Sequence, residues 1–558
     1  MDEARLTRLD ERELRELIDR RDVLHALEPQ RLHLRWWRPC SVRVLLVTDG
    51  GLDFGSGDFG LRTFVTTLLS GTYPAHFRIT LAHRRSRGGD AMMEDDGRVE
   101  RRISGFRFDD RGHFAADQYD QLWMFGIESA PGITDREVRA VAEFMDAGGG
   151  VFATGDHAAL GRAMGERIPR VRSMRLWDST PGVDEVSMGG HRRNDTNRRG
   201  HDAASTFDDQ SDDVPQVITP RWYRTRVGLF EAVYPHPLLC GPDGAITVMP
   251  DHPHEGECHE PADTSQVVDV GGASFVEYPP AVGGGPKPVP EVIATSTVLG
   301  GTKSGTKDAT QGHTFGGIAA YDGHLAGVGR VVTDATWHHF VNINLIGAAG
   351  AAPPKDSGFL ATPAGASHLA RVRTYYRNTA TWISPPGLLR CMNRRLLWDL
   401  VWHHRVVEAV ATTAEVDLRR AHPVLLWHIG KQARDVLGRR TSACQSVRLV
   451  LDLVWQEALP ELFPEVDPWL PRDLESRPAP QQVPWFDPSP VLDLALGSAV
   501  TAVHQAFAED EQVDQDSLDE RLDEVLARGV AVGLERARES AREALEQLDA
   551  LVQRVTTR

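Results

Sequence analysis

Hydrophobic positions along residues 40–350 fall into short continuous runs that are separated by segments with helical spacing. The runs at 42–47, 77–82, 119–127 and 151–154 have the length and the apolar character of buried strands. Between them, apolar residues recur every three or four positions, as they do on the buried face of a helix. Strands that alternate with helices predict an α/β domain built on a doubly wound parallel sheet.

The stretch 148–157 is the centre of this pattern, because the end of a helix, a strand and a turn follow one another within it. Thr134 and Glu137 form a capping box at the start of the preceding helix, and three glycines end that helix. The apolar run after the glycines predicts an inner strand, which leads directly into Asp156 and His157. Ligands bind beyond the carboxyl ends of the strands in such sheets. We therefore expect Asp156 and His157 to lie at the centre of a functional site.

The pattern changes twice beyond this point. Residues 175–290 are expected to form a long insertion, after which strand signals return at 291–297, 316–321 and 328–333. Residues 351–366 are rich in Ala, Pro and Gly, which predicts a linker, and an all-α helical C-terminal region follows. The expected units are an N-terminal helix (1–39), the sheet domain (40–350), a helical region (367–470), a proline-rich spacer (471–490) and C-terminal helices (491–558).

An apolar residue recurs in the last expected helix at alternating intervals of three and four positions. The residues of this seam are Leu534, Ala537, Ala541, Ala544, Leu548, Leu551 and Val555. Such a seam either packs on helices of the same chain or joins two chains in a coiled coil. The sequence thus leaves room for a homodimer or a protein partner at the C-terminal helices.

Composition narrows the range of partners. The net charge of −17 on 558 residues argues against binding to nucleic acid or to an anionic membrane surface. No run of 18 apolar residues is present, so a membrane-spanning helix is not expected. The five cysteines are scattered and lack a CxxC pair, a pattern typical of a reducing compartment rather than of a disulfide framework. Together with an acidic N-terminus unlike a signal peptide, these features predict a cytoplasmic protein.

Four loops that follow expected strands are rich in carboxylate and imidazole side chains. The first contains Asp49, Asp53 and Asp58, and the second contains Asp156 and His157. The third is 251–257 (Asp251, His252, His254, Glu255 and Glu257), with Cys258 and His259 behind it, and the fourth is 334–339 (Asp334, His338 and His339). His338 and His339 are adjacent, so they are not both expected to point inward. Because the carboxyl ends of parallel strands share one edge of a sheet, we expect these loops to converge. The alternative for each histidine is a structural role, in which it caps a helix or hydrogen-bonds to the loop backbone.

The third loop has the spacing of a metal site. In an extended segment residues i and i+2 point the same way, so His252 and His254 can face one ion. Glu257 can add an oxygen ligand, and this mixed set of ligands suits Zn, Mn or Fe.

The remaining candidates have supporting roles. Asp49 and Glu257 are candidate bases beside Asp156 and His157. Contacts with the substrate are expected from Asp53, Asp58, His338, Arg192 and Arg193. The two arginines can close over an anionic group or remain part of a solvated charged loop.

Two glycine-rich motifs argue only weakly for a nucleotide. Residues 55–60 match G-x-G-x-x-G, but several residues separate the motif from its strand and three aspartates would crowd a pyrophosphate. Residues 300–307 fail as a P-loop, because Thr306 follows Gly305 where a lysine is required. No nucleotide cofactor is therefore expected.

Three stretches of the expected sheet domain resemble the class I glutamine amidotransferase-like superfamily, nearest to its ThuA-like (trehalose-utilisation) branch. They are the elbow at 148–155, the late strand at 291–295, and the run 327–332 followed by His338. The resemblance implies a flavodoxin-like sheet with a pocket at the elbow. Amidotransferases carry a nucleophilic cysteine at the elbow, whereas this chain continues with Asp156 and His157, so a Cys-dependent glutaminase is not expected.

These features together favour a metal-assisted hydrolase or lyase that acts on a small polar, sugar-like substrate. A bound metal would lower the pKa of a water molecule towards neutrality and so supply the nucleophile. The alternative is a non-catalytic module, in which the elbow binds a metabolite and the helical region docks a partner protein.

Overall fold

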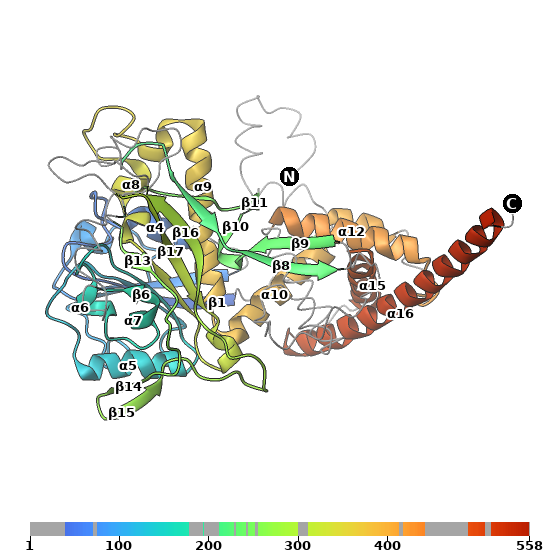
Figure 1. Ribbon diagram of the computed structural model, residues 1–558, viewed down its shortest axis with the longest axis horizontal. Coiled ribbons are helices and arrows are strands. Elements are labelled where there is room, and N and C mark those ends of the chain that lie inside the picture. The colour runs from blue at the N-terminus through green and yellow to red at the C-terminus, as the bar shows by residue number, and fades with distance from the viewer. Residues whose placement is uncertain are drawn as a thin grey trace.

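The computed structural model has a sheet part and a helical part, and a long C-terminal helix projects from the helical part (Figure 1). It describes residues 40–70, 75–177, 194, 211–227, 230–241, 244–251, 255–298, 311–411, 417–440, 489–507 and 515–556. The expected N-terminal helix and most of the expected proline-rich spacer lie outside these residues.

A 12-stranded mixed sheet forms the centre of the sheet part. Half of it has the order β3-β2-β1-β4-β5-β18, in which every neighbouring pair is parallel. These strands are β1 (Cys40–Thr48), β2 (Ala75–His83), β3 (Arg101–Ser104), β4 (Gln121–Phe125), β5 (Gly150–Thr154) and β18 (Val331–Asp334). The apolar runs thus became inner strands, and the α/β architecture predicted from the sequence is confirmed.

The other half of the sheet is antiparallel, contrary to the expectation of parallel strands throughout. β16 (Glu291–Val298) and β17 (His313–Tyr321) pair antiparallel, and β17 is also antiparallel to β18. The connection 322–330 explains this second pairing, because a parallel crossover takes about a dozen residues or more.

The expected insertion at 175–290 supplies further strands of the same sheet. They are β6 (Arg175–Leu176), β7 (Gln216–Pro220), β12 (Val248–Met249) and β13 (Glu257–Cys258). Separate two-stranded pairs join β8 (Trp222–Val227) with β9 (Phe230–Pro235), β10 (Cys240–Gly241) with β11 (Gly244–Ala245), and β14 (Val267–Val270) with β15 (Ala273–Val276). Much of the expected insertion is therefore part of the sheet domain itself.

Helices cover both faces of the sheet. Adjacent residues of β4 face opposite ways, so Trp123 lies in one core and Met124 in the other. α4 (Arg62–Leu69) and α9 (Pro363–Trp382) pack on the Trp123 face. α5 (Asp135–Asp146) packs on the Met124 face, and the predicted capping box is present at its first turn.

α9 crosses the boundary that the composition predicts. Residues 351–366 were expected to be a linker before a separate helical region, but Val372, Tyr375 and Tyr376 of α9 are buried in the core of the sheet part. The apolar side of α9 is needed there because it covers β-strand residues that would otherwise face water. The helix that follows the expected linker therefore belongs to the sheet domain.

The helical part has a core of its own, which includes Leu397, Ile429 and Val500. Its helices are α10 (Pro386–Val401), α11 (His404–Ala411), α12 (Pro423–Arg440), α15 (Ser489–Phe507) and α16 (Gln515–Thr556). Short helices elsewhere are α6 (Arg162–Gly165), α7 (Val171–Met174), α8 (Asn342–Ile346) and the 3-10 turns η1 (Gly89–Met92), η4 (Pro237–Leu239), η5 (Gly323–Ala326), η6 (Trp337–His339) and η7 (Gly358–Ala361). Among the helices that the structure describes, none combines the length and the apolar character needed to cross a bilayer.

A disulfide joins the sheet part to the helical part, which corrects the expectation drawn from the cysteines. Cys40 at the start of β1 is bonded to Cys391 in α10, across a sequence separation of 351 residues. Cys240 is also disulfide-bonded, whereas Cys258 is free and buried. Pairing over such distances leaves no signature in local spacing, so scattered cysteines do not indicate a reducing compartment here.

Candidate functional site

The loops after β5 and β18 meet at the carboxyl edge of the parallel strands. The Trp337 backbone N–H donates to the carbonyl oxygen of Gly155 at 3.0 Å, so the turn after β18 lies against the elbow after β5. The segment after residue 254 packs onto both. A Cβ atom on Gly256 would lie 2.8 Å from the Asp156 carbonyl oxygen and 2.7 Å from that of Ala335, which only glycine permits. Three of the four expected loops therefore meet here.

A buried arginine holds these three loops together. The Arg175 guanidinium is fully buried and donates to the carbonyl oxygens of Asp156 (2.5 Å) and Ala335 (2.9 Å). It also stacks on the ring of Trp177, with 4.5 Å between the guanidinium carbon and the ring centroid. Because a buried cation satisfies two loop carbonyls, the elbow and the turn after β18 are fixed relative to each other.

The carboxylate of Asp156 lies between two imidazoles. Its Oδ2 atom is 2.9 Å from Nδ1 of His157 and 4.0 Å from Nε2 of His338. Asp156 and His338 are buried, whereas the side chain of His157 is 33% exposed. Carboxylate and imidazole groups in this arrangement can exchange protons, orient one another or share a cation.

The protonation pattern of His338 follows from its neighbours. Asn344 donates from Nδ2 to the Asp251 carbonyl oxygen (3.0 Å), so its Oδ1 atom faces Nδ1 of His338 at 2.8 Å. Nδ1 must therefore carry the hydrogen, and in the neutral ring Nε2 presents a lone pair towards Asp156. The third loop thus contributes through the backbone of Asp251, which orients His338 by way of Asn344.

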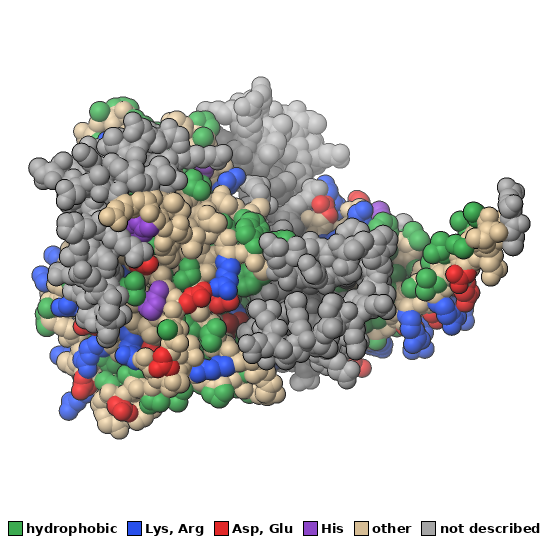
Figure 2. Space-filling model, in the orientation of Figure 1, with side chains coloured by type: hydrophobic (Ala, Val, Ile, Leu, Met, Phe, Trp, Pro, Cys, Tyr) green, Lys and Arg blue, Asp and Glu red, His purple; other side chains and the backbone are tan. Residues whose placement is uncertain are grey.

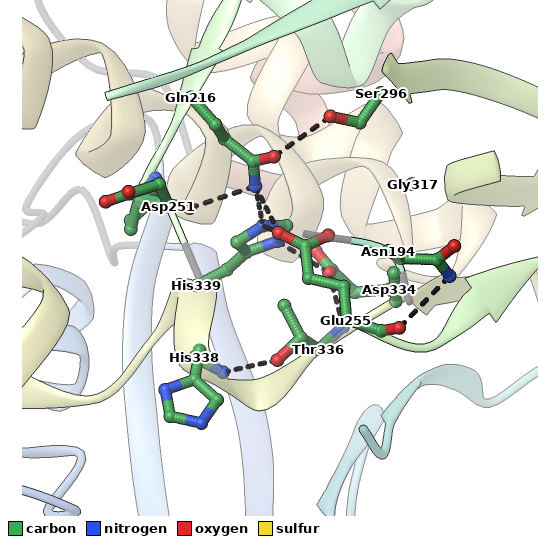
Figure 3. A network of polar contacts seen from close by, with 12 residues as sticks. Asn194, Gln216, Asp251, Glu255, Ser296, Gly317, Asp334, Thr336, His338 and His339 are labelled. Carbon is green, nitrogen blue, oxygen red and sulfur yellow. Dashed lines mark hydrogen bonds and ion pairs between the residues drawn. The ribbon is translucent and has the colours of Figure 1, made fainter. Parts of the chain in front are cut away.

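A second, deeper cluster surrounds the neighbouring histidine. His339 donates from Nδ1 to Asp334 Oδ1 (2.7 Å), and its Nε2 is 3.5 Å from Glu255 Oε1 (Figure 3). Tyr375 of α9 donates to the other carboxylate oxygen of Asp334 at 2.9 Å. Figure 3 shows the His338 ring pointing away from this cluster. The two adjacent histidines therefore belong to different sets of contacts.

Charge in the deep cluster is shared between one imidazole and two acids. Burial raises the pKa of Glu255 to about 7, although the nearby His339 opposes the rise. Burial lowers the pKa of His339, but the charges of Asp334 and Glu255 outweigh it and raise that pKa to about 10. The two neighbouring carboxyl groups therefore favour the charged form of His339.

Gln216 and Asn194 add further hydrogen bonds to this cluster. Gln216 donates from Nε2 to the Pro250 carbonyl oxygen (2.9 Å) and to Glu255 Oε1 (2.5 Å), and its Oε1 accepts from Ser296 (3.0 Å). Asn194 donates to the carbonyl oxygens of Glu255 and Gly256. Polar groups that are buried and paired in this way rigidify a site.

The first loop reaches the site through an aromatic ring rather than through its aspartates. Phe59 is 45% exposed, and its ring lies 5.7 Å from that of Trp337 and 6.1 Å from that of His338. Asp53 accepts a hydrogen bond from the Gly55 backbone, and Asp58 is exposed. The expected substrate contacts of Asp53 and Asp58 stay predictions, since the observed contact of Asp53 shapes its own loop.

Asp49 is buried where the end of β1 meets the loop after β4. Its Oδ1 atom accepts hydrogen bonds from the backbone N–H groups of Ile127 (2.7 Å) and Glu128 (3.1 Å). Burial raises the pKa of this carboxyl to about 6, against the opposing effect of the two backbone hydrogen bonds. The observed contacts of Asp49 are structural, because they tie the end of β1 to the loop after β4.

The expected metal ligands are only partly visible. His252 and His254, like Arg192 and Arg193, lie outside the described residues. Glu257 is half-buried on β13, where it is paired with Leu176, and the carboxylate that contacts His339 belongs to Glu255 instead. Within the part of the chain that the structure describes, no three His, Cys, Asp or Glu side chains are grouped as they would be around a metal ion.

Several residues of the site escaped the sequence analysis. They are Arg175, Gln216, Asn344 and Tyr375. Glu255, Asp334 and His339 stand in the expected loops, but the sequence alone assigned them no role there. Asp334 ends a predicted strand and His339 follows His338, so their positions gave a signal. Arg175 and Tyr375 gave none, because nothing in the local pattern shows that they turn towards the sheet edge. No family model, no curated protein and no solved structure matches this chain.

Proposed function

We propose that the carboxyl edge of β5 and β18 is the active site of a hydrolase or lyase that acts on a small polar, sugar-like molecule. The observation that carries the proposal is the position of the Asp156 carboxylate between His157 (2.9 Å) and His338 (4.0 Å). Asp156 accepts from Nδ1 of His157 and so orients this partly exposed ring, to which we assign the role of general base.

The two imidazoles have complementary roles in this mechanism. His157 is oriented by the carboxylate of Asp156, an arrangement that suits a general base. His338 is oriented by the amide of Asn344, which suits contact with a substrate hydroxyl or a metal ion. Proton transfer by a positioned side chain contributes typically about 10²–10⁴-fold to a rate.

A divalent metal (Zn, Mn or Fe) is part of the proposal. One carboxylate and two imidazoles, those of Asp156, His157 and His338, are donor groups that such ions accept, and His252 and His254 would complete the set. The metal would supply a water molecule of lowered pKa. Glu257 stays a candidate ligand or base on the strength of its position in the sequence alone.

The proposed substrate class follows from the side chains at the edge. Carboxylates accept hydrogen bonds from hydroxyl groups, and the exposed ring of Phe59 offers an apolar surface beside His338. A polyhydroxylated ring presents both features, hydroxyl groups at its rim and C–H groups on its face. The sheet edge therefore suits an uncharged sugar or a close relative of one.

We also propose a flavodoxin-like, amidotransferase-like relationship for the sheet part. Numbered among themselves, β1, β2, β4, β5 and β18 have the order 2-1-3-4-5, which is the order of doubly wound sheets of the flavodoxin type. The elbow after β5 carries Asp156 where the resemblance places a cysteine. Burial raises the pKa of the only free thiol in the described chain, Cys258, to about 12, which supports chemistry without a thiolate.

A substrate panel with matched variants tests the proposal. Chromogenic esters, phosphoesters and glycosides, together with sugar lactones, would be assayed with and without added Zn, Mn or Fe, alongside elemental analysis of the purified protein. Asp156→Asn and His157→Gln should each lower kcat/KM by about 100-fold or more. His76→Gln, on an exposed residue of β2, is the control and should retain full activity.

Two outcomes would argue against catalysis. If Asp156→Asn and His157→Gln both retained the activity of the wild type, the residues named here would not perform the reaction. If no compound were turned over but a sugar raised the unfolding temperature of the wild type and not of the variants, the edge would be a binding site. The second outcome would favour the metabolite-binding module.

A further inference from the structure

The outer part of α16 is a helix with an apolar face and no covering partner among the described residues. Residues 522–534 of α16 pack on the helical core, where Leu522, Val525, Leu526 and Val530 are buried and Leu534 is half-buried. Residues 541–556 are all exposed, and they project beyond the rest of the molecule (Figure 1).

Apolar side chains line one edge of this projecting segment. Five of them, Leu545, Leu548, Leu551, Val552 and Val555, are between 49% and 69% exposed. Figure 2 shows hydrophobic side chains along one side of the projecting helix and charged side chains along the other. A contiguous apolar stripe on an otherwise charged surface marks an interaction site.

The stripe continues an interface that the chain already uses. The seam with intervals of three and four begins with Val530 and Leu534 in the helical core, passes through the half-buried Ala537, and runs on into the exposed residues. A helix of about 16 residues is marginal in water without tertiary contacts. The projecting segment therefore needs a partner that covers the same seam.

We propose that the partner is α16 of a second copy of this chain, packed antiparallel. The small residues of the seam, Ala541 and Ala544, lie nearer the helical core, and the large residues, Leu548 and Leu551, lie nearer the end. An antiparallel pair sets Ala541 opposite Leu551 and Ala544 opposite Leu548, and each layer occurs twice about the two-fold axis. Small residues that face large ones fill a helix interface without gaps.

A parallel pair would be packed less well. It would stack alanine on alanine at positions 541 and 544 and leucine on leucine at 548 and 551, which leaves a gap at one end. It would also bring the two bulky helical parts to the same end of the coiled coil. The antiparallel pair places them at opposite ends, because each helix projects away from its own body (Figure 1).

The side chains that flank the seam are compatible with self-association. The flanking positions 545 and 552 are Leu and Val on one side, and 540 and 547 are Ser and Gln on the other. Charged residues such as Arg542, Glu543 and Glu546 lie on the outer face of the helix. Two copies therefore meet without like charges opposite each other in the two central layers.

Sedimentation velocity over a range of concentrations tests the self-association. The wild type should sediment with twice the mass of the chain. Leu548→Asp combined with Leu551→Asp should raise the dissociation constant by more than about 100-fold, since each copy loses two buried leucines. Ala550→Asp combined with Gln553→Asp adds the same charge to the outer face and should leave the dimer intact.

Spin-label distances test the orientation. With a label on Thr556→Cys, the two labels lie about 30 Å apart along the axis in the antiparallel pair, but only roughly 10 Å apart in a parallel pair. Both leucines are exposed and lie outside the cores of the chain, so the double variant should keep the fold of the sheet part and of the helical core. Its far-UV circular dichroism should lose at most the helical signal of residues 541–556. The measured distance is independent of that variant.

Three results would overturn the proposal. The first is a wild type that stays monomeric at all concentrations, as it would if a segment of its own chain covered the seam. The second is a dimer that survives Leu548→Asp with Leu551→Asp, which would place the interface elsewhere. The third is a label distance near 10 Å, which would show parallel packing.

Discussion

The buried carboxyl group of Asp49, at the end of β1, should make the stability of the protein depend on pH. Asp49 is 1% exposed, and its Oδ1 atom accepts hydrogen bonds from the backbone of Ile127 and Glu128. Burial raises the pKa of this carboxyl from 3.8 to about 6. Asp49→Asn keeps an oxygen that can accept both hydrogen bonds and removes the ionisable group. We therefore expect the variant to be more stable than the wild type at neutral pH.

The size of the effect follows from the two pKa values. A carboxyl whose pKa is higher in the folded state than in the unfolded state favours folding while it is protonated. That contribution is fully present below pH 3.8 and is lost as the pH rises through 6. The difference between the two values corresponds to about 3 kcal/mol in the free energy of unfolding. Roughly 2.5 kcal/mol of this is lost between pH 4 and pH 8.

Urea unfolding at pH 4, 6 and 8 measures the effect. The free energy of unfolding of Asp49→Asn, relative to that of the wild type, should rise by roughly 2.5 kcal/mol over this range. Asp58→Asn removes an exposed carboxylate from the loop that follows and should show no such rise. The reasoning would be refuted if Asp49→Asn and the wild type differed in the free energy of unfolding by the same amount at all three pH values. Loss of activity in a stabilised variant would instead restore Asp49 as a candidate base.

Three further predictions concern groups that hold the site in place. Cys391→Ser opens the disulfide to Cys40 and should lower the free energy of unfolding by about 2–5 kcal/mol, and the reduced wild type should lose at least as much in urea. Tyr375→Phe removes the hydroxyl that donates to the Asp334 carboxylate and should destabilise by about 1.5–3 kcal/mol in thermal unfolding. Tyr376→Phe, whose hydroxyl donates to a neutral carbonyl group, should destabilise by only about 1 kcal/mol. Gly155→Ala sets a Cβ atom 2.6 Å from the Leu160 carbonyl oxygen and should abolish the activity proposed for the elbow, whereas Gly57→Ala, which meets no atom within 4 Å, should retain it.

The parallel half of the sheet could be predicted because its signals are local. The apolar run at 151–154 became β5, and the capping box at Thr134 begins α5 as expected. The meeting of the loops after β5 and β18 follows from the same pattern, since parallel neighbours end at one edge. Periodicity therefore sufficed to find Asp156, His157 and His338 and to expect them near one another.

The antiparallel half could not be predicted in the same way, because pairing direction depends on contacts that are remote in sequence. β13 pairs with β17 and β6, and none of the three is adjacent to another in the chain. A two-residue strand such as Glu257–Cys258 has no periodicity to detect. The sequence therefore indicates Glu257 as a candidate ligand or base, but it gives no sign that Glu255 is the carboxylate that contacts His339.

The predictions about the cysteines and about the helix after the expected linker were wrong for a related reason. The disulfide between Cys40 and Cys391 spans most of the chain, and its partners become neighbours only after the sheet and α10 have formed. α9 follows a segment with the composition of a linker, yet its tyrosines contact Asp334 and His339. Composition reports how flexible a segment is, and it does not report which core the next helix joins.

The adjacent histidines His338 and His339 make contacts with different groups. η6 is a short turn of 3-10 helix, and the rings of its two histidines point in different directions. His339 is fixed by Asp334, which is also the last residue of β18, so the turn is anchored to the sheet itself. That anchoring holds His338 at a set distance from Asp156, and alignment of this kind contributes more to a reaction than the mere presence of the groups. The sequence could show that two histidines follow a strand, but only the structure distinguishes His339, which Asp334 anchors, from His338, which lies beside Asp156.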